Sequence, residues 1–257
     1  MTTARKFTLG LIVPVVLASL YTLWTTTVPN PFFPTPAEIA DEFQQLWLFD
    51  KIGTDVLPSL SNFVLGFIAA TVLGITTGVL LGRIRAIRLL FTPLLDFGRS
   101  VPAIMLIPPF VLILGINDAS KIAIITLGAF FPIVLATVDG MLRVDPALID
   151  VTRSLQLSRW KEIRVAWLPA ASPSIAGGMQ TGMQFALILM VSSEMLAATR
   201  GIGYLTMQAQ LTFDSPRVWA GIVFVAILGF TLNAVFVVAK NRVLQWHNAM
   251  HTASNAR

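Results

Sequence analysis

The sequence predicts an all-α integral membrane protein with six transmembrane helices and with both chain ends in the cytoplasm. Composition is the first of three observations behind this prediction: hydrophobic residues make up 55% of the 257 positions and charged residues only 12%. A soluble domain carries about 25% charged residues, and a disordered chain has far fewer hydrophobic residues. The second observation is a set of long uncharged stretches, and the third is the distribution of lysine and arginine.

Six stretches of 17 or more residues contain no Asp, Glu, Lys or Arg. Because about 17–25 helical residues cross a bilayer, each stretch is long enough for one span. Trimmed at turn-forming residues, the stretches predict helices near 7–25, 58–81, 92–115, 119–141, 171–194 and 217–240. The third helix must include Asp96 and Arg99, which are three residues apart and can form an ion pair. We expect Pro108-Pro109 to bend this helix.

Basic residues are concentrated in the segments that face the cytoplasm if the N-terminus does. These segments hold 13 of the 18 lysines and arginines. An excess of basic residues marks cytoplasmic loops, so both termini are expected inside. Arg5 and Lys6 before an apolar run would also suit a signal peptide, but Tyr21 and Trp24 follow where a cleavage site needs small residues. We therefore expect an uncleaved first span.

The segment 25–57 is expected on the outer side and to contain a short amphipathic helix. Thr35-Pro36-Ala37-Glu38 has the pattern of a capping box with proline at the first helical position. An apolar stripe follows at helical spacing: Ile39, Phe43, Leu46 and Trp47. This helix would lie on the membrane surface or pack against the spans. The chain then divides into 1–57 with the first span and this segment, a core of five spans over 58–245, and a polar tail over 246–257.

Small residues recur every four positions in two of the predicted spans. The second span carries Gly66, Ala70, Gly74, Gly78 and Gly82, and the fifth carries Ser174, Gly178, Gly182 and Ala186. Such ridges allow helix backbones to approach closely in lipid. Both spans are therefore predicted to lie inside the bundle.

Polar residues also lie in the fifth span. Gln180, Thr181 and Gln184 are within it, and Glu194 is at its outer end. Polar groups in a membrane are costly and usually face a bundle interior or an aqueous path. These residues are candidates for the wall of a translocation path, with Glu194 as a gate or cap. Helix–helix hydrogen bonding is the alternative.

Several kinds of chemistry are missing from the sequence. It has no cysteine and no phosphate-binding loop, and Gly201-Ile202-Gly203 predicts only a turn. His247 and His251 lie in the tail without an evident third ligand, so we expect no metal site, no catalytic residues and no enzyme activity. The net charge of +5 is assigned to cytoplasmic loops rather than to nucleic-acid binding.

The longest inner loop, over 142–170, predicts two short helices. Asp145 and Ser158 can each cap a helix start. Six residues are expected to form a buried stripe: Ile149, Thr152, Leu155, Trp160, Ile163 and Val165. The two helices would form a docking platform at the cytoplasmic face or an ordinary amphipathic loop.

This loop resembles the "EAA" loop of ABC importer permeases. From Asp150 to Leu168-Pro169 the spacing matches without a gap, although Val151 and Thr152 replace two alanines and Gln156 replaces a glycine. Further stretches resemble the nitrate/sulfonate/taurine-type subfamily: Phe33–Ile39, Arg99–Pro102 with Ile107-Pro108, Phe130–Ile133, Ser193–Leu196 and Gly201–Tyr204. The resemblance covers about residues 30 to 245.

The resemblance implies a type I ABC importer permease-like bundle in the bacterial inner membrane, surrounded by lipid. Such a subunit forms the path for a small anion or small organic molecule delivered by an external substrate-binding protein. It pairs with a second permease copy, as a homodimer here, and with cytoplasmic ATP-binding subunits that hold ATP and magnesium, so this chain needs no cofactor. The implied ATPase-coupling residues are Asp150, Arg153, Ser154, Leu155, Gln156, Leu157, Ser158 and Trp160.

Two points stay open at this level. Glycine in the place of Gln156 would permit a turn with positive φ, so Gln156 implies a different turn or a small strain. The main rival function is a secondary transporter or channel not powered by ATP, which predicts inverted repeats or acid–base relays inside the membrane. A membrane scaffold or receptor subunit is a third possibility.

Overall fold

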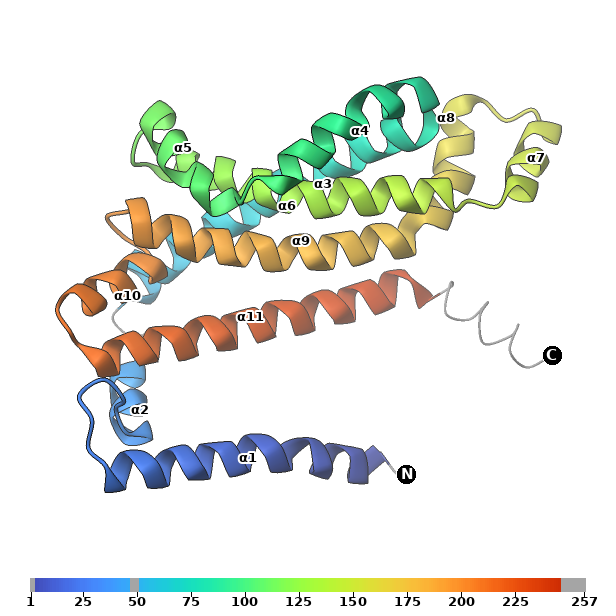
Figure 1. Cartoon of the computed structure of the whole chain (residues 1–257). Coiled ribbons are helices and arrows are strands. Elements are labelled where there is room, and N and C mark those ends of the chain that lie inside the picture. Colours follow the sequence, from blue (N-terminus) through green and yellow to red (C-terminus); the bar gives the residue numbers. More distant parts are fainter. Residues whose placement is uncertain (1–2, 47–50, 246–257) are drawn as a thin grey trace.

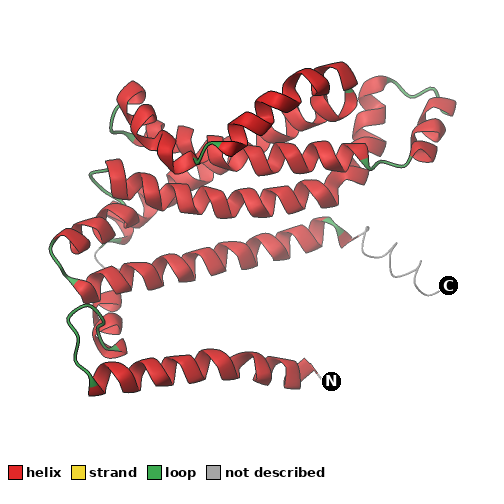
Figure 2. Ribbon diagram, viewed as in Figure 1, coloured by secondary structure: helices red, strands yellow, loops and turns green. Residues whose placement is uncertain are grey.

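The computed structural model describes residues 3–46 and 51–245, and this part of the chain is helical almost throughout (Figures 1 and 2). The helices in chain order are α1 (Thr3–Thr27), α2 (Pro36–Gln45), η2 (Ile52–Val56), α3 (Leu57–Arg83), α4 (Arg85–Ser100), η3 (Ala103–Leu106), α5 (Ile107–Leu114), α6 (Asp118–Leu142), α7 (Pro146–Ser154), α8 (Arg159–Glu162), η4 (Ile163–Trp167), α9 (Leu168–Ala197), α10 (Ile202–Leu211) and α11 (Ser215–Val243). The all-α class is confirmed.

The core is formed where α3 and α9 both pack against α6 and contact each other. Ile133 of α6 is fully buried between two glycines. A Cβ atom added to Gly74 of α3 would lie 2.7 Å from Ile133 Cγ2, and one added to Gly182 of α9 would lie 2.9 Å from Ile133 Cγ1. Real Cβ contacts are not this short, so only glycine permits the spacing. The two predicted small-residue ridges are therefore confirmed as packing surfaces.

The third predicted helix is wrong as a continuous span. α4 begins at Arg85 and ends at Ser100, and the chain bends by 88° before α5. The break falls at Val101 because the following Pro102 disfavours helical backbone there, and Val101 is extended (φ −79°, ψ 122°). Pro108 and Pro109 do not produce the bend. They occupy the first turn of α5, where a missing N–H costs nothing.

The described helices provide most of the predicted spans. Four long segments are apolar enough to cross a membrane, and the bent pair of α4 with η3–α5 can form a fifth span. The apolar part described for α1, Ile12–Thr27, is shorter than a full span, so the sixth stays a prediction. In Figure 1 the first turn of α1, the last turn of α11 and the pair α7–α8 lie at the same end of the bundle. We call this the platform end.

The predicted amphipathic helix is present as α2. Its capping box is complete: the Thr35 N–H donates to Glu38 Oε2 (2.7 Å), and the Glu38 N–H donates to Thr35 Oγ1 (3.4 Å). The rings of Phe43 and Phe224 are 6.1 Å apart, and Arg217 Nε lies 3.4 Å from Glu42 Oε2. Of the two alternatives, α2 therefore packs against the span α11.

Some predictions fall on residues that the structure does not describe. Trp47 of the predicted stripe, the tail 246–257, and its histidines His247 and His251 lie outside the described residues.

One helix was missed. Gly201-Ile202-Gly203 was predicted to be only a turn, but α10 begins at Ile202 and continues to Leu211. Gly201 precedes it with φ +120°, a conformation that favours glycine.

Candidate functional site

The start of α10 is bound by side chains from three other helices, η2, α3 and α9. Its first N–H groups donate to Asp55, Ser59 and Glu194: Gly201 N to Asp55 Oδ1 (2.8 Å), Ile202 N to Ser59 Oγ (3.1 Å) and Gly203 N to Glu194 Oε2 (3.0 Å). All three side chains are buried. We call Asp55, Ser59 and Glu194 the α10 cap cluster. It satisfies N–H groups that a helix start leaves without partners.

A second polar group lies at the same end of the bundle, opposite the platform. Asp118, at the start of α6, accepts hydrogen bonds from Asn62 of α3 (3.1 Å), Lys121 (3.2 Å) and Arg200 (2.7 Å). Lys121 is buried, with 6% of its side chain exposed. The group joins α3 and α6 to the link between α9 and α10. Sequence reasoning missed it because Asn62 and Arg200 are 56 and 82 residues away from Asp118 in the chain.

The polar residues of α9 do not form a single wall. Gln180 Nε2 donates to Asn233 Oδ1 of α11 (3.0 Å), and Gln180 Oε1 accepts from Lys240 Nζ (2.7 Å). Gln180 therefore takes the helix–helix role that was the alternative. Thr181 and Gln184 are exposed instead, on the side of α9 turned away from α6.

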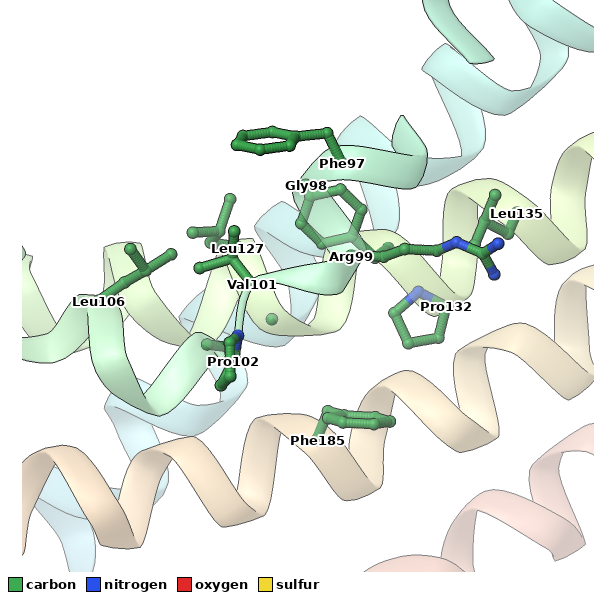
Figure 3. Close-up of a pocket in the computed structure, with 13 residues that line it drawn as sticks. Phe97, Gly98, Arg99, Val101, Pro102, Leu106, Leu127, Pro132, Leu135 and Phe185 are labelled. Atoms are coloured by element: carbon green, nitrogen blue, oxygen red, sulfur yellow. The ribbon is translucent and has the colours of Figure 1, made fainter. Parts of the chain in front are cut away.

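A pocket of about 500 Å³ lies beside the break that follows α4 (Figure 3). Three aromatic rings from three helices line it: Phe97 of α4, Phe131 of α6 and Phe185 of α9. Arg99 is the charged residue among those lining it, and Arg99 Nη2 lies 3.0 Å from Asp96 Oδ1, which confirms the predicted ion pair. Sequence reasoning placed Arg99 in a span but assigned it no function.

The predicted two-helix platform is present at the platform end. Asp145 Oδ1 accepts from the Ala147 N–H (2.8 Å), and Ser158 Oγ accepts from the Lys161 N–H (3.4 Å), so both predicted caps are confirmed. They fix where α7 and α8 begin.

The predicted buried stripe of the platform is only half correct. Ile149 and Thr152 are buried, but Leu155, Trp160 and Val165 are 66%, 72% and 64% exposed. α7 packs against η4, and the side chains of Leu155, Trp160 and Val165 lie outside the buried part of the platform. The platform therefore presents apolar side chains that this chain does not cover.

The turn after α7 keeps the shape that glycine would give it. Gln156 has φ +51°. The Gln156 N–H donates to Arg153 O (2.9 Å), and the Leu157 N–H donates to Thr152 O (3.2 Å). These two bonds form a Schellman motif, the usual helix end with a left-handed residue. The alternative of a small strain is therefore the correct one, at a cost of about 1–2 kcal/mol for a residue with a Cβ atom.

The platform is attached to α3 by an ion pair and an aromatic ring. Arg83 Nη2 lies 3.0 Å from Glu162 Oε2, and Trp167 Nε1 donates to Glu162 Oε1 (2.9 Å). The Arg83 guanidinium lies 5.4 Å from the centre of the Trp167 ring, within cation–π range. We call these three residues the platform clamp. A movement of α8 is thereby connected to the end of α3.

Long apolar helices, a pocket beside a broken helix and an exposed platform at one end define a multi-pass membrane transport subunit. Residues 62–245 match the family described as "Binding-protein-dependent transport system inner membrane component". The match covers more than half of the chain, and the protein belongs to this family.

Relatives and solved structures agree with this assignment. The chain is 31% identical over 242 residues to the putative aliphatic sulfonates transport permease protein of Bacillus subtilis (strain 168), covering 93% of this chain and 88% of that one. It is 29% identical over 241 residues to the taurine transport system permease protein of Escherichia coli (strain K12), covering 90% and 88%. An inward-facing structure of the MetNI methionine ABC transporter matches its fold with a TM-score of 0.60 at 21% identity, covering 74% of this chain and 93% of that one.

The chain is therefore the permease subunit of a bacterial ABC importer, in the inner membrane, and not an enzyme. Membership in the family implies an ATP-binding subunit and a substrate-binding protein as partners. The rival of a transporter or channel not powered by ATP is set aside.

Proposed function

We propose that this permease works as a homodimer and imports a small organic anion of the sulfonate class. The platform residues couple this transport to ATP, which the partner subunits bind together with magnesium. The observation that carries the proposal is the exposed apolar surface of the platform, because an exposed patch of this kind marks a contact with another protein.

The geometry of α7 supports docking into a partner. Leu148, Val151 and Leu155 follow one another at three and four residues, so they share a helix face, and all three are exposed. Ile149, on a neighbouring face of the helix, is buried against this chain. A helix that packs on its own chain with one face and exposes apolar side chains on another is suited to fill a cleft in a partner. The exposed apolar side chains would then contribute most of the binding energy.

The charged and polar residues of the platform form its rim. Asp150 and Arg153 form an exposed ion pair with 3.6 Å between Arg153 Nη1 and Asp150 Oδ1, and Ser154 Oγ donates to the Asp150 carbonyl (2.9 Å). An exposed pair of this kind contributes about 0–1 kcal/mol. Ser158 positions α8, and Gln156 with Leu157 closes the turn, so these residues shape the surface that Leu155 and Trp160 present.

The path is proposed to run along the open side of α9 between two copies of the chain. Thr181 and Gln184 lie on that side with Gly177, and all three are exposed within one copy. Exposed polar groups half-way along a spanning helix favour an aqueous path. Glu194, in the α10 cap cluster, is proposed to hold the outer gate closed.

The end opposite the platform is proposed as the surface for the binding protein. Phe32, Leu211 and Phe213 are 62%, 68% and 81% exposed there. Phe213 has φ +57°, which is unusual for a bulky side chain.

Reconstitution tests the proposal. The permease, its ATP-binding subunit and its binding protein are placed in proteoliposomes with ATP on the side of the ATP-binding subunit. We expect ATP-dependent uptake of radiolabelled taurine or butane-1-sulfonate. Loading of the binding protein with methionine and not with either sulfonate, or uptake that continues without ATP, would contradict it.

A further inference from the structure

We propose that the pocket beside the break after α4 is a binding site for the transported organic anion inside the permease. Arg99 holds the anionic group and the three phenylalanine rings hold the apolar part. The inference rests on the proposed function, and it assigns the substrate contact to named residues of this chain.

The depth of the pocket supports this inference. Phe131 and Pro132 line it half-way along the 25 residues of α6, and Phe185 lines it past the middle of the 30 residues of α9. An arginine at this depth is costly in a membrane protein, and such residues usually mark a substrate or ion pathway. The ion pair with Asp96 reduces this cost when the site is empty.

The broken helix explains how a charge reaches this depth. Arg99 lies in the last turn of α4, and the 88° bend directs the chain away from the helix axis just beyond it. Gly98 allows the end of α4 to lie close to the Phe131 ring of α6, because a Cβ atom at this position would lie only 2.7 Å from Phe131 Cζ. In Figure 3 the Arg99 side chain extends past Pro132 toward Leu135, with Phe97 and Phe185 on opposite sides of it.

Arg99 retains the capacity to bind an anion. Its side chain is 56% exposed, and the ion pair with Asp96 engages Nη2. A guanidinium has five N–H donors in a planar fork, which suits the oxygens of a sulfonate or carboxylate. Asp96 is itself 51% exposed and is not one of the residues that line the pocket, so the ion pair is not buried and leaves Arg99 accessible. An arriving anion would replace the Asp96 carboxylate as the partner of the Arg99 guanidinium.

The size and lining of the pocket select the class of anion. About 500 Å³ is within the range of small-molecule sites, about 300–1,000 Å³. Beyond Arg99 the lining is almost entirely apolar, including Leu106, Leu127 and Leu135. Inorganic sulfate would leave this apolar surface without a partner. We therefore infer that a short alkyl or aryl sulfonate binds better than sulfate.

A protection experiment measures binding directly. The natural chain has no cysteine, so Leu127→Cys places one thiol in the pocket wall. The rate of its reaction with a charged methanethiosulfonate reagent is measured in the assembled complex, with butane-1-sulfonate or sulfate present. We expect butane-1-sulfonate to slow labelling at least fivefold, and sulfate to have less than a twofold effect. No protection by butane-1-sulfonate would overturn the inference.

The charge is tested by Arg99→Gln, with Arg85→Gln at the other end of the same helix as the control. Arg99→Gln should remove the protection and lower sulfonate uptake at least tenfold, with unchanged assembly and unchanged affinity of the binding protein. Arg85→Gln should retain both the protection by butane-1-sulfonate and the uptake of sulfonate. Uptake at the rate of the natural chain in Arg99→Gln would overturn the inference, whereas absence of uptake in the natural complex would count against the proposed function instead.

A membrane lipid is the other source of an anion with an apolar body. Labelling of the Leu127→Cys variant is therefore compared in vesicles of phosphatidylcholine with and without phosphatidylglycerol. We expect equal labelling rates in the two kinds of vesicle. Protection by phosphatidylglycerol alone would assign the pocket to lipid and overturn the inference.

Discussion

The turn between α7 and α8 depends on the backbone of one residue, Gln156, at φ +51°. We expect Gln156→Gly to be neutral or to stabilise the subunit by up to about 1 kcal/mol, because the left-handed strain is relieved while the unfolded chain gains freedom. Gln156→Val should be destabilising by about 1–2 kcal/mol, since a β-branched side chain fits this conformation poorly. Thermal unfolding of the purified subunit measures both. Equal melting temperatures for Gln156→Val and the natural chain would contradict the backbone strain at position 156.

Glu194 is the second residue whose role can be tested, through the hydrogen bond that it accepts from the Gly203 N–H at 3.0 Å. Glu194→Gln keeps an acceptor oxygen, so assembly should be intact while transport or stimulated ATP hydrolysis falls. Glu194→Leu leaves a buried N–H without a partner and should cost about 1–3 kcal/mol of stability. Thermal unfolding and stimulated hydrolysis are the measurements. A leucine variant as stable as the natural chain would show that the cap is dispensable.

Between elements, the packing of α9 on α6 can be tested with two adjacent glycines. A Cβ atom on Gly178 would lie 2.8 Å from the Pro132 carbonyl oxygen, whereas one on Gly177 would meet nothing within 4 Å. Gly178→Ala should therefore destabilise the subunit by about 1–3 kcal/mol through overpacking. Gly177→Ala is the matched control and should be neutral or stabilising by about 0.5–1 kcal/mol. The melting temperatures of the two variants are compared by thermal unfolding. An equal change in melting temperature for Gly178→Ala and Gly177→Ala would contradict the close packing of α9 on α6.

The elements that the sequence predicted well are those defined by their own residues. α3, α6, α9 and α11 follow from long apolar runs, and α2, α7 and α8 follow from local caps. α10 was missed because its cap comes from Asp55, which is 146 residues away from Gly201. The break at Val101-Pro102 was missed because an apolar run continues across it. The Arg99 pocket needed the positions of three helices, which no local pattern contains.

For the whole molecule, topology follows from the arrangement of the helix ends. We expect Gln45→Cys in α2 to react with a membrane-impermeant thiol reagent in intact cells, and Ser154→Cys in α7 to react only after permeabilisation. Both positions are exposed, and the natural chain has no other cysteine to give background. The reverse labelling pattern would invert the orientation derived from the basic residues.

The central claim is that the platform couples this permease to ATP hydrolysis, and Leu155→Asp tests it most directly. Leu155 is 66% exposed within this chain, so the substitution should leave the isolated fold intact. In the complex a buried, unpaired carboxylate would cost about 3–5 kcal/mol. Arg153→Ala, at the exposed rim, is the control and should cost about 0–1 kcal/mol. The measurement is co-purification with the ATP-binding subunit, together with hydrolysis stimulated by the binding protein. We predict loss of both in Leu155→Asp and retention in Arg153→Ala, whereas normal complex yield and normal stimulated hydrolysis in Leu155→Asp would contradict the claim.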